Sequence, residues 1–110
     1  MPMATPREVI DLISQRVEAN PKDAAEIDAS YQFDLHGEGG GQWVLHLREP
    51  ASVSEGTSNA DCIISLSAED FVALFEGKAS GQGLFFAGKL KIEGDMQQAL
   101  KLRKLVQLLR

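Results

Sequence analysis

Two alternating segments joined by a glycine run constrain the fold of this chain more than any other feature. The apolar members of the two segments are Tyr31, Phe33, Leu35, Trp43, Leu45 and Leu47, and polar residues separate most of them. Alternation with a period of two is typical of strands that bury one face. Residues 37–41 between the segments hold four glycines, which favours a hairpin connection. The sequence therefore predicts an antiparallel pair of half-buried strands.

A helix is predicted before this hairpin. Thr5 and Glu8 have the spacing of a capping box, and apolar residues then recur at helical intervals. The pair Asn20-Pro21 predicts the end of this helix, because proline disfavours a helical conformation in the residue before it. A weaker helical turn is expected over residues 22–29.

After the hairpin, Pro50 is expected to end or edge the second strand. A short third strand is predicted over residues 51–56, and the apolar run 62–66 predicts a buried strand. Ser67 then has the position of a helix N-cap, and Gly77 has that of a left-handed terminator.

The C-terminal third predicts a loop over residues 80–83, one apolar helical turn over 84–87 and a last strand over 89–93. Asp95 is expected to cap a long final helix. Strands concentrated early and helices late favour an α+β fold, with helices on one face of a mainly antiparallel sheet. A length of 110 residues with 44% hydrophobic content fits a single domain over residues 1–110.

Charge is unevenly distributed along the chain. Residues 1–77 hold four Lys/Arg and fourteen Asp/Glu, whereas residues 78–110 hold seven Lys/Arg and two Asp/Glu. The acidic body argues against nucleic-acid binding. The basic end would suit transient contact with an anionic membrane, although cations near a helix C-terminus also complement the helix dipole, which is our preferred reading. A single cysteine and an N-terminus without an apolar run indicate a cytoplasmic protein.

No group of side chains predicts an active site. The glycine run does not match a phosphate-binding loop, since strand patterns lie on both sides of it. His36 and His46 flank the hairpin and could lie across from one another, but two histidines without a third ligand make a poor zinc site. Cys62 begins an apolar strand and is expected to be a small buried side chain. We therefore expect no enzymatic activity, no cofactor and no metal.

The segment Gly88–Asp95 (GKLKIEGD), followed by Ala99, Lys101 and Leu102, is the most specific motif of the chain. With Trp43 on a strand after a glycine turn, it resembles the sterol carrier protein-2 (SCP2) sterol-transfer domain family. The resemblance covers nearly the whole chain. It implies a five-stranded, mainly antiparallel sheet with about five helices on one face, which enclose an apolar tunnel.

The resemblance also implies non-catalytic binding and transfer of a lipid, which could be a fatty acid, fatty acyl-CoA, sterol or phospholipid. Carried over by position, the residues implied to line or gate the tunnel are Trp43, Phe71, Leu74, Phe75, Leu84, Phe85, Met96, Gln97 and Leu100. The final helix is apolar over more than one face, so an alternative function remains open. In that alternative, Leu105 and Leu109 form the interface of a homodimer or of a module that associates with a lipid-metabolising enzyme.

Overall fold

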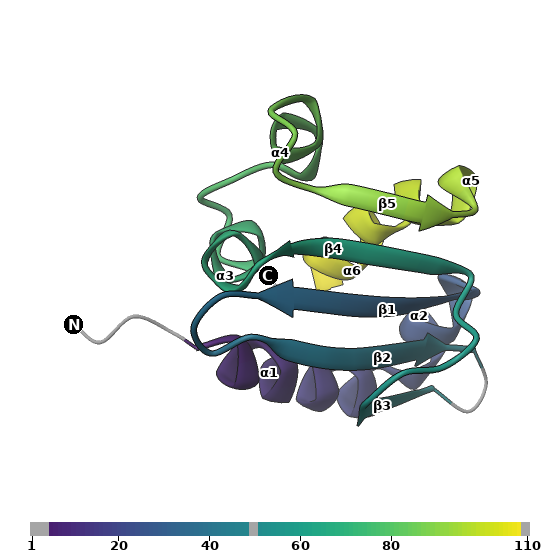
Figure 1. Cartoon of the computed structure of the whole chain (residues 1–110). Helices are drawn as coiled ribbons and strands as arrows, with labels where there is room; N and C mark the ends of the chain where they lie inside the picture. Colours follow the sequence, from purple (N-terminus) through teal and green to yellow (C-terminus); the bar gives the residue numbers. More distant parts are fainter. Residues whose placement is uncertain (1–4, 49–50, 109–110) are drawn as a thin grey trace.

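A computed structural model describes residues 5–48 and 51–108 of the chain. Its centre is a five-stranded sheet with the strand order β3-β2-β1-β4-β5 (Figure 1). The strands are β1 (Ala29–His36), β2 (Gly41–Leu47), β3 (Ser52–Glu55), β4 (Cys62–Ser67) and β5 (Lys91–Gly94). Pro50 and Leu109, which figure in the predictions above, lie outside the described residues.

Strand pairing is antiparallel except between β1 and β4, which confirms the predicted mainly antiparallel sheet. The predicted hairpin joins β1 to β2, with Phe33 opposite Trp43. Because β3 and β4 lie on opposite sides of the hairpin, residues 56–61 must cross one face of the sheet (Figure 1). This crossing buries Gln32, whose side-chain oxygen accepts a hydrogen bond from the Ser58 N–H at 3.1 Å.

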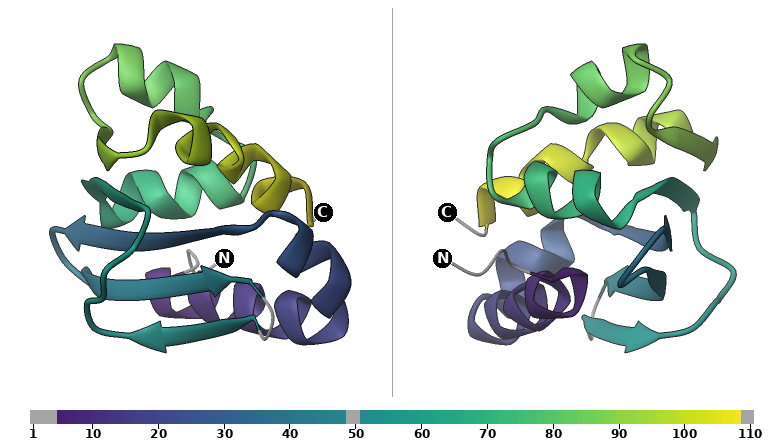
Figure 2. Two further views of the ribbon diagram at one scale, coloured as in Figure 1. Left: turned by 90° about the vertical axis from the view of Figure 1, so that its right-hand side faces the viewer. Right: turned by 60° about the vertical axis from the view of Figure 1, so that its left-hand side comes forward.

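Helices cover the other face of the sheet, and they supply half of the apolar core (Figures 1 and 2). Within the described residues they are α1 (Pro6–Ala19), α2 (Pro21–Glu26), α3 (Ala68–Phe75), α4 (Gly81–Phe86), α5 (Met96–Leu100) and α6 (Leu102–Leu108). Both halves of the predicted capping box form at Thr5 and Glu8. The Ser67 side chain caps α3, and Gly77 adopts the predicted left-handed conformation.

The structure corrects the predicted elements in three places. The predicted loop over residues 80–83 is wrong, because the Ser80 side chain accepts from the Gly83 N–H and starts α4 at Gly81. The final helix is not continuous, since a turn at Lys101 separates α5 from α6. The helical turn predicted over residues 22–29 is α2, which ends at Glu26 before Asp28 takes a φ of 50° and β1 begins. None of these changes alters the predicted fold class.

The core lies between the helices and the helix-facing side chains of β1, β2 and β4. On that face the alternating residues predicted to be buried are buried, from Tyr31 on β1 to Leu47 on β2. Their alternation partners, such as Asp34 and His46, point to the other face. No helix in the described part of the chain is long and apolar enough to cross a bilayer.

Candidate functional site: the apolar interior between sheet and helices

An aromatic cluster occupies the middle of the interior. Phe33 on β1 contacts Phe71 on α3 edge to face, with ring centroids 5.2 Å apart. Phe75 is one turn further along α3. Its ring centroid lies 4.9 Å from that of Phe71 and 6.3 Å from that of Phe33. The spacing of four residues places both rings on the same face of α3, so the helix presents them together to the sheet. The result is an apolar interior, in which no buried side chain of the described residues is charged.

The structure divides the residues implied by the family resemblance into a buried and an exposed set. Trp43, Phe71, Leu74, Phe75 and Leu84 are buried in one apolar cluster. Phe85, Met96, Gln97 and Leu100 are exposed, and they lie on α4 and α5 at the periphery. The role of all nine as ligand contacts stays a prediction.

α4 contacts the apolar interior through one buried side chain. Leu84 is its one buried residue, and it joins the same cluster as Leu74 of α3. The Leu84 carbonyl accepts hydrogen bonds from the N–H groups of Lys89 and Leu90, at 2.9 Å and 3.2 Å, which fold the chain back toward β5. Glycines bound this helix on both sides, at Gly77 and Gly88. A short helix with one fully buried side chain has fewer core contacts than the longer helices of the fold, and such segments open locally more readily.

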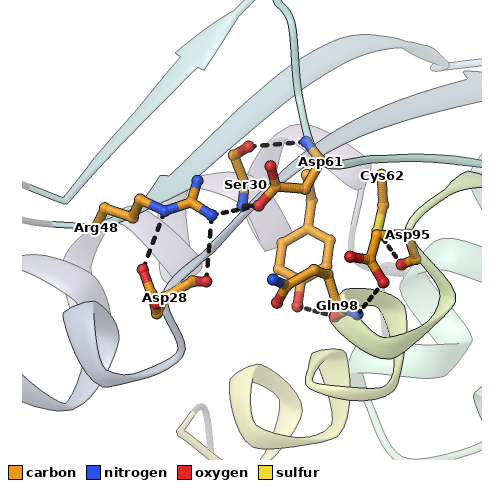
Figure 3. Close-up of polar contacts among 8 residues, drawn as sticks. Asp28, Ser30, Arg48, Asp61, Cys62, Asp95 and Gln98 are labelled. Atoms are coloured by element: carbon orange, nitrogen blue, oxygen red, sulfur yellow. Dashed lines mark hydrogen bonds and ion pairs between the residues drawn. The ribbon is translucent and has the colours of Figure 1, made fainter.

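Polar groups mark the end of the interior near α5. The Tyr31 hydroxyl donates to the Gln98 carbonyl at 2.6 Å, and the Cys62 thiol donates to the Asp95 carbonyl at 2.9 Å. Burial raises the pKa of both Tyr31 and Cys62 above their ordinary values. The nearby Asp61 and Asp95 charges raise the Cys62 pKa further, so this thiol stays protonated at neutral pH and is a weak nucleophile. The hydrogen bonds from Tyr31 and Cys62 tie the start of α5 to the sheet, and Figure 3 shows Cys62 next to Asp95.

Gln98 is not among the predicted ligand contacts, which include its neighbour Gln97. The Gln97 side chain is exposed, whereas Gln98 Oε1 is buried without a hydrogen-bond partner among the described residues. No local signal distinguishes Gln98 from Gln97 in the sequence, since the turn at Lys101 ends the helical spacing that a continuous final helix would have. A buried acceptor without a partner is open to a donor from water or from a ligand.

Arg48, which follows β2, joins the residues that precede β1 and β4 at one end of the central strands (Figure 3). Its guanidinium donates to the carboxylate and carbonyl of Asp28, and also to the Asp61 carboxylate. Asp61 in turn exchanges two hydrogen bonds with Ser30, through the Ser30 N–H and the Ser30 hydroxyl. The hydrogen bond to Asp61 raises the pKa of Arg48. Burial alone would raise the Asp61 pKa, but the bonds from Arg48 and Ser30 outweigh it and lower that pKa.

The lowered pKa gives a pH-dependent prediction. A carboxyl with a lower pKa in the folded state stabilises the fold above its unfolded pKa, and this contribution disappears as pH falls through the folded pKa. We expect Asp61→Asn to lower the free energy of unfolding by about 1–2 kcal/mol at about pH 7. The difference should shrink as pH falls below the ordinary value of 3.8. Urea unfolding at several pH values measures it.

Asp11→Asn is the matched control, since Asp11 is exposed on α1. It should change stability by less than about 0.5 kcal/mol at any of these pH values. A difference between Asp61→Asn and the unmodified chain that stays constant down to about pH 2 would contradict the role given to the Asp61 charge.

The two histidines are not neighbours. His46 pairs with Ser30 at one end of the hairpin, whereas His36 lies beside Ser67 of β4 at the other end. The alternative that they lie across from one another is therefore wrong. No group of three or more side chains suited to a metal ion forms within residues 5–48 and 51–108.

The chain matches one known protein family over most of its length. A model of the SCP-2 sterol transfer family matches residues 10–107. The chain belongs to this family. Among SCP-2 relatives, hydroxysteroid dehydrogenase-like protein 2 from Bos taurus is 44% identical over 81 residues, which cover 71% of this chain and 19% of that protein. The chain thus matches about a fifth of the relative's length.

Solved SCP-2 structures share the fold. The apo form of sterol carrier protein 2 from Yarrowia lipolytica has a TM-score of 0.79 and 30% identity, covering 92% of this chain and 88% of that chain. Sterol carrier protein-2 from Aedes aegypti, in complex with palmitate, has a TM-score of 0.76 over 98% of this chain and 100% of that chain. Its identity of 16% shows the fold alone. The SCP-2 fold expected from the sequence is confirmed.

Proposed function

We propose that this chain binds a lipid between the sheet and the helices and transfers it without catalysis. The observation that carries the proposal is the interior itself, where aromatic and aliphatic side chains from β1, β2, α3 and α4 meet with no charged group among them. Membership of a sterol transfer family supports the proposal, as does the palmitate complex of the Aedes aegypti protein with the same fold. The ligand is a fatty acid, fatty acyl-CoA, sterol or phospholipid.

Binding would be driven by the apolar chain of the lipid. Each buried CH₂ group contributes about 0.8 kcal/mol, so a long acyl chain binds tightly without a charged partner. A single polar group on the lipid would contact Gln98 Oε1 near α5, which is buried and has no hydrogen-bond partner within residues 5–48 and 51–108. Because that oxygen is an acceptor, it suits a hydroxyl or a protonated carboxyl group. The lipid enters when α4 moves away and Leu84 leaves the apolar cluster.

The test is a displacement titration with a fluorescent fatty acid and unlabelled palmitate as competitor. We expect saturable binding with one site, and we expect Leu84→Ala to speed release of the fatty acid by about tenfold, because α4 loses its one buried contact. Leu12→Ala removes a leucine that is exposed on α1 and should leave the rates unchanged. Absence of saturable binding for fatty acid, sterol and phospholipid probes alike would overturn the proposal.

A second proposal concerns the enzyme with which the chain exchanges its lipid. The Bos taurus relative is about five times longer than the part that matches, and its name refers to a dehydrogenase-like protein. We propose that the lipid bound here is supplied to, or received from, a lipid-metabolising enzyme of the cytoplasm. The interface first considered for such an association, through Leu105, is wrong: the Leu105 side chain is fully buried in the domain's own core.

A further inference from the structure

Strand β5 forms one edge of the sheet, where it follows β4 in the strand order (Figure 1). The Asp95 N–H donates to the Asp61 carbonyl at 3.1 Å, and the adjacent residues Gly94 and Cys62 are register partners. In an antiparallel ladder this bond makes Gly94, and with it Ile92, a non-hydrogen-bonded position toward β4. The N–H and C=O of Ile92 therefore point to the outer edge, where a further strand can pair with them.

The chain before β5 limits how such a strand can pair. The Leu90 N–H has the same direction in the ladder as that of Ile92, but it donates to the Leu84 carbonyl of α4 at 3.2 Å. An added strand therefore finds a donor and an acceptor together at Ile92 rather than at Leu90. The geometry favours a pairing that is centred on Ile92.

The charges of β5 complement a second copy of the same strand. Ile92 packs against the core, so Lys91 and Glu93 lie on the opposite face, and both are exposed. In an antiparallel pair with a twofold axis at Ile92, Lys91 of each copy lies opposite Glu93 of the other. These are non-hydrogen-bonded positions, where opposing side chains come closest. An axis at Lys91 or at Glu93 would instead oppose like charges and would need backbone groups that bond to β4.

The helices on either side of β5 carry most of the exposed apolar side chains. Within residues 5–48 and 51–108 five large hydrophobic residues are exposed, and four of them lie on α4 and α5. These four are Phe85, Phe86, Met96 and Leu100, with exposed fractions of 39%, 76%, 49% and 76%. Such a concentration usually marks a surface that another molecule covers.

A twofold axis at Ile92 would bring these side chains together. α4 precedes β5 and α5 follows it, and the two helices lie near opposite ends of the strand (Figure 1). An antiparallel partner strand reverses this order. α4 of one copy therefore comes next to α5 of the other, and this happens twice in a symmetric pair.

We propose that two copies of the chain form a dimer through β5, with one continuous sheet and with α4 of each copy packed on α5 of the partner subunit. The two short strands alone would fall short of the roughly 1,200 Å² that a stable protein interface buries, so the contacts between helices are a necessary part of it. A strand of an unrelated protein would have to supply the charge order of Lys91 and Glu93 in reverse. A second copy supplies it by symmetry.

The dimer would also control release of the lipid, a step that rests on the proposed function. Leu84 is the one buried residue of α4. In the dimer Phe85 and Phe86 would be covered by α5 of the partner subunit, which adds contacts that hold α4 in place. A lipid would then leave the dimer more slowly than the monomer.

Sedimentation velocity over a range of protein concentrations, without lipid, tests the dimer. We expect the unmodified chain to self-associate. Lys91→Glu and Glu93→Lys should each weaken the dimer about tenfold, because each change opposes like charges twice in the symmetric pair. An equimolar mixture of these two variants should associate as strongly as the unmodified chain, since every opposing pair is again of opposite charge. Both side chains are exposed, so neither change should alter the folded state.

Phe86→Ser and Leu100→Ser test the contacts between helices, and each should weaken the dimer at least about tenfold. The matched controls are Leu12→Ser on α1 and Lys22→Glu on α2, which change exposed residues away from β5 and should associate as the unmodified chain does. A chain that stays monomeric up to about 1 mM would overturn the dimer. A mixture of the two charge variants that associates no better than either alone would overturn the register.

Fatty-acid release, measured below and above the concentration at which the dimer forms, separates this proposal from the proposed function. We expect release to be severalfold slower from the dimer, and we expect Phe86→Ser to remove the dependence on concentration. Equal release rates from dimer and monomer would overturn the control of release. An intact dimer that takes up no lipid would overturn the proposed function and leave the dimer in place.

Discussion

We expect the Leu105→Glu variant to be largely unfolded. Leu105 is fully buried where α6 packs against the core, and a carboxylate at a buried apolar position is costly to accommodate. The lost apolar contact and the buried charge together should cost about 4 kcal/mol or more, which is most of the stability of a domain of this size. Circular dichroism and urea unfolding measure the loss.

Arg103→Glu is the control for this change, because Arg103 is exposed on the same helix. It should lower stability by less than about 1 kcal/mol. If Leu105→Glu instead gave a stable, folded monomer from a dimeric parent, the leucine would be an interface residue and the packing of α6 described above would be incorrect. Sedimentation velocity of the same samples distinguishes the two results.

A second large effect is expected at Gly94, the last residue of β5. A Cβ atom at this position would lie 2.3 Å from the Asp61 carbonyl oxygen, and the φ of 105° already excludes most other residues. The same carbonyl accepts from the Asp95 N–H at 3.1 Å, so the backbone of β5 cannot move away without losing the start of α5. We expect Gly94→Ala to destabilise the fold by about 3 kcal/mol or more.

Gly88→Ala is the matched control. Gly88 also has a positive φ, of 74°, but nothing lies within 4 Å of the place where its Cβ would stand. That variant should lose only about 1 kcal/mol, from backbone strain alone. Equal losses of stability in the two variants, measured by urea unfolding, would contradict the close approach of β5 to Asp61.

Local sequence signals predicted most of the fold because they act through local physics. The capping box at Thr5 and Glu8, and the alternation that buries Tyr31 and Phe33, need only near neighbours to be recognised. The α4 error shows the limit of this reasoning. The helix starts with Gly81, Gln82 and Gly83, and glycine has a low helix propensity. The side chain of Ser80 nevertheless caps a six-residue helix there.

The candidate site was predictable only where it is apolar. Phe71 and Phe75 have the spacing of one buried helix face, so their meeting in the core follows from the sequence. The bonds of Arg48 to Asp61 and of Tyr31 to Gln98 join residues 13 and 67 positions apart. They depend on the crossing of residues 56–61 over the sheet and on the packing of α5 against β1 and β4, which the sequence pattern did not reveal.

Native mass spectrometry of the chain, purified without detergent and then incubated with lipids, tests most directly whether the interior holds one. The account predicts a mass increment that matches one fatty acid, acyl-CoA, sterol or phospholipid molecule, and extraction of the same sample would name the class. A mass equal to that of the chain alone, with no uptake of any added lipid, would mean that Phe33, Phe71 and Phe75 fill the interior permanently. That result would contradict lipid binding as the function of this fold.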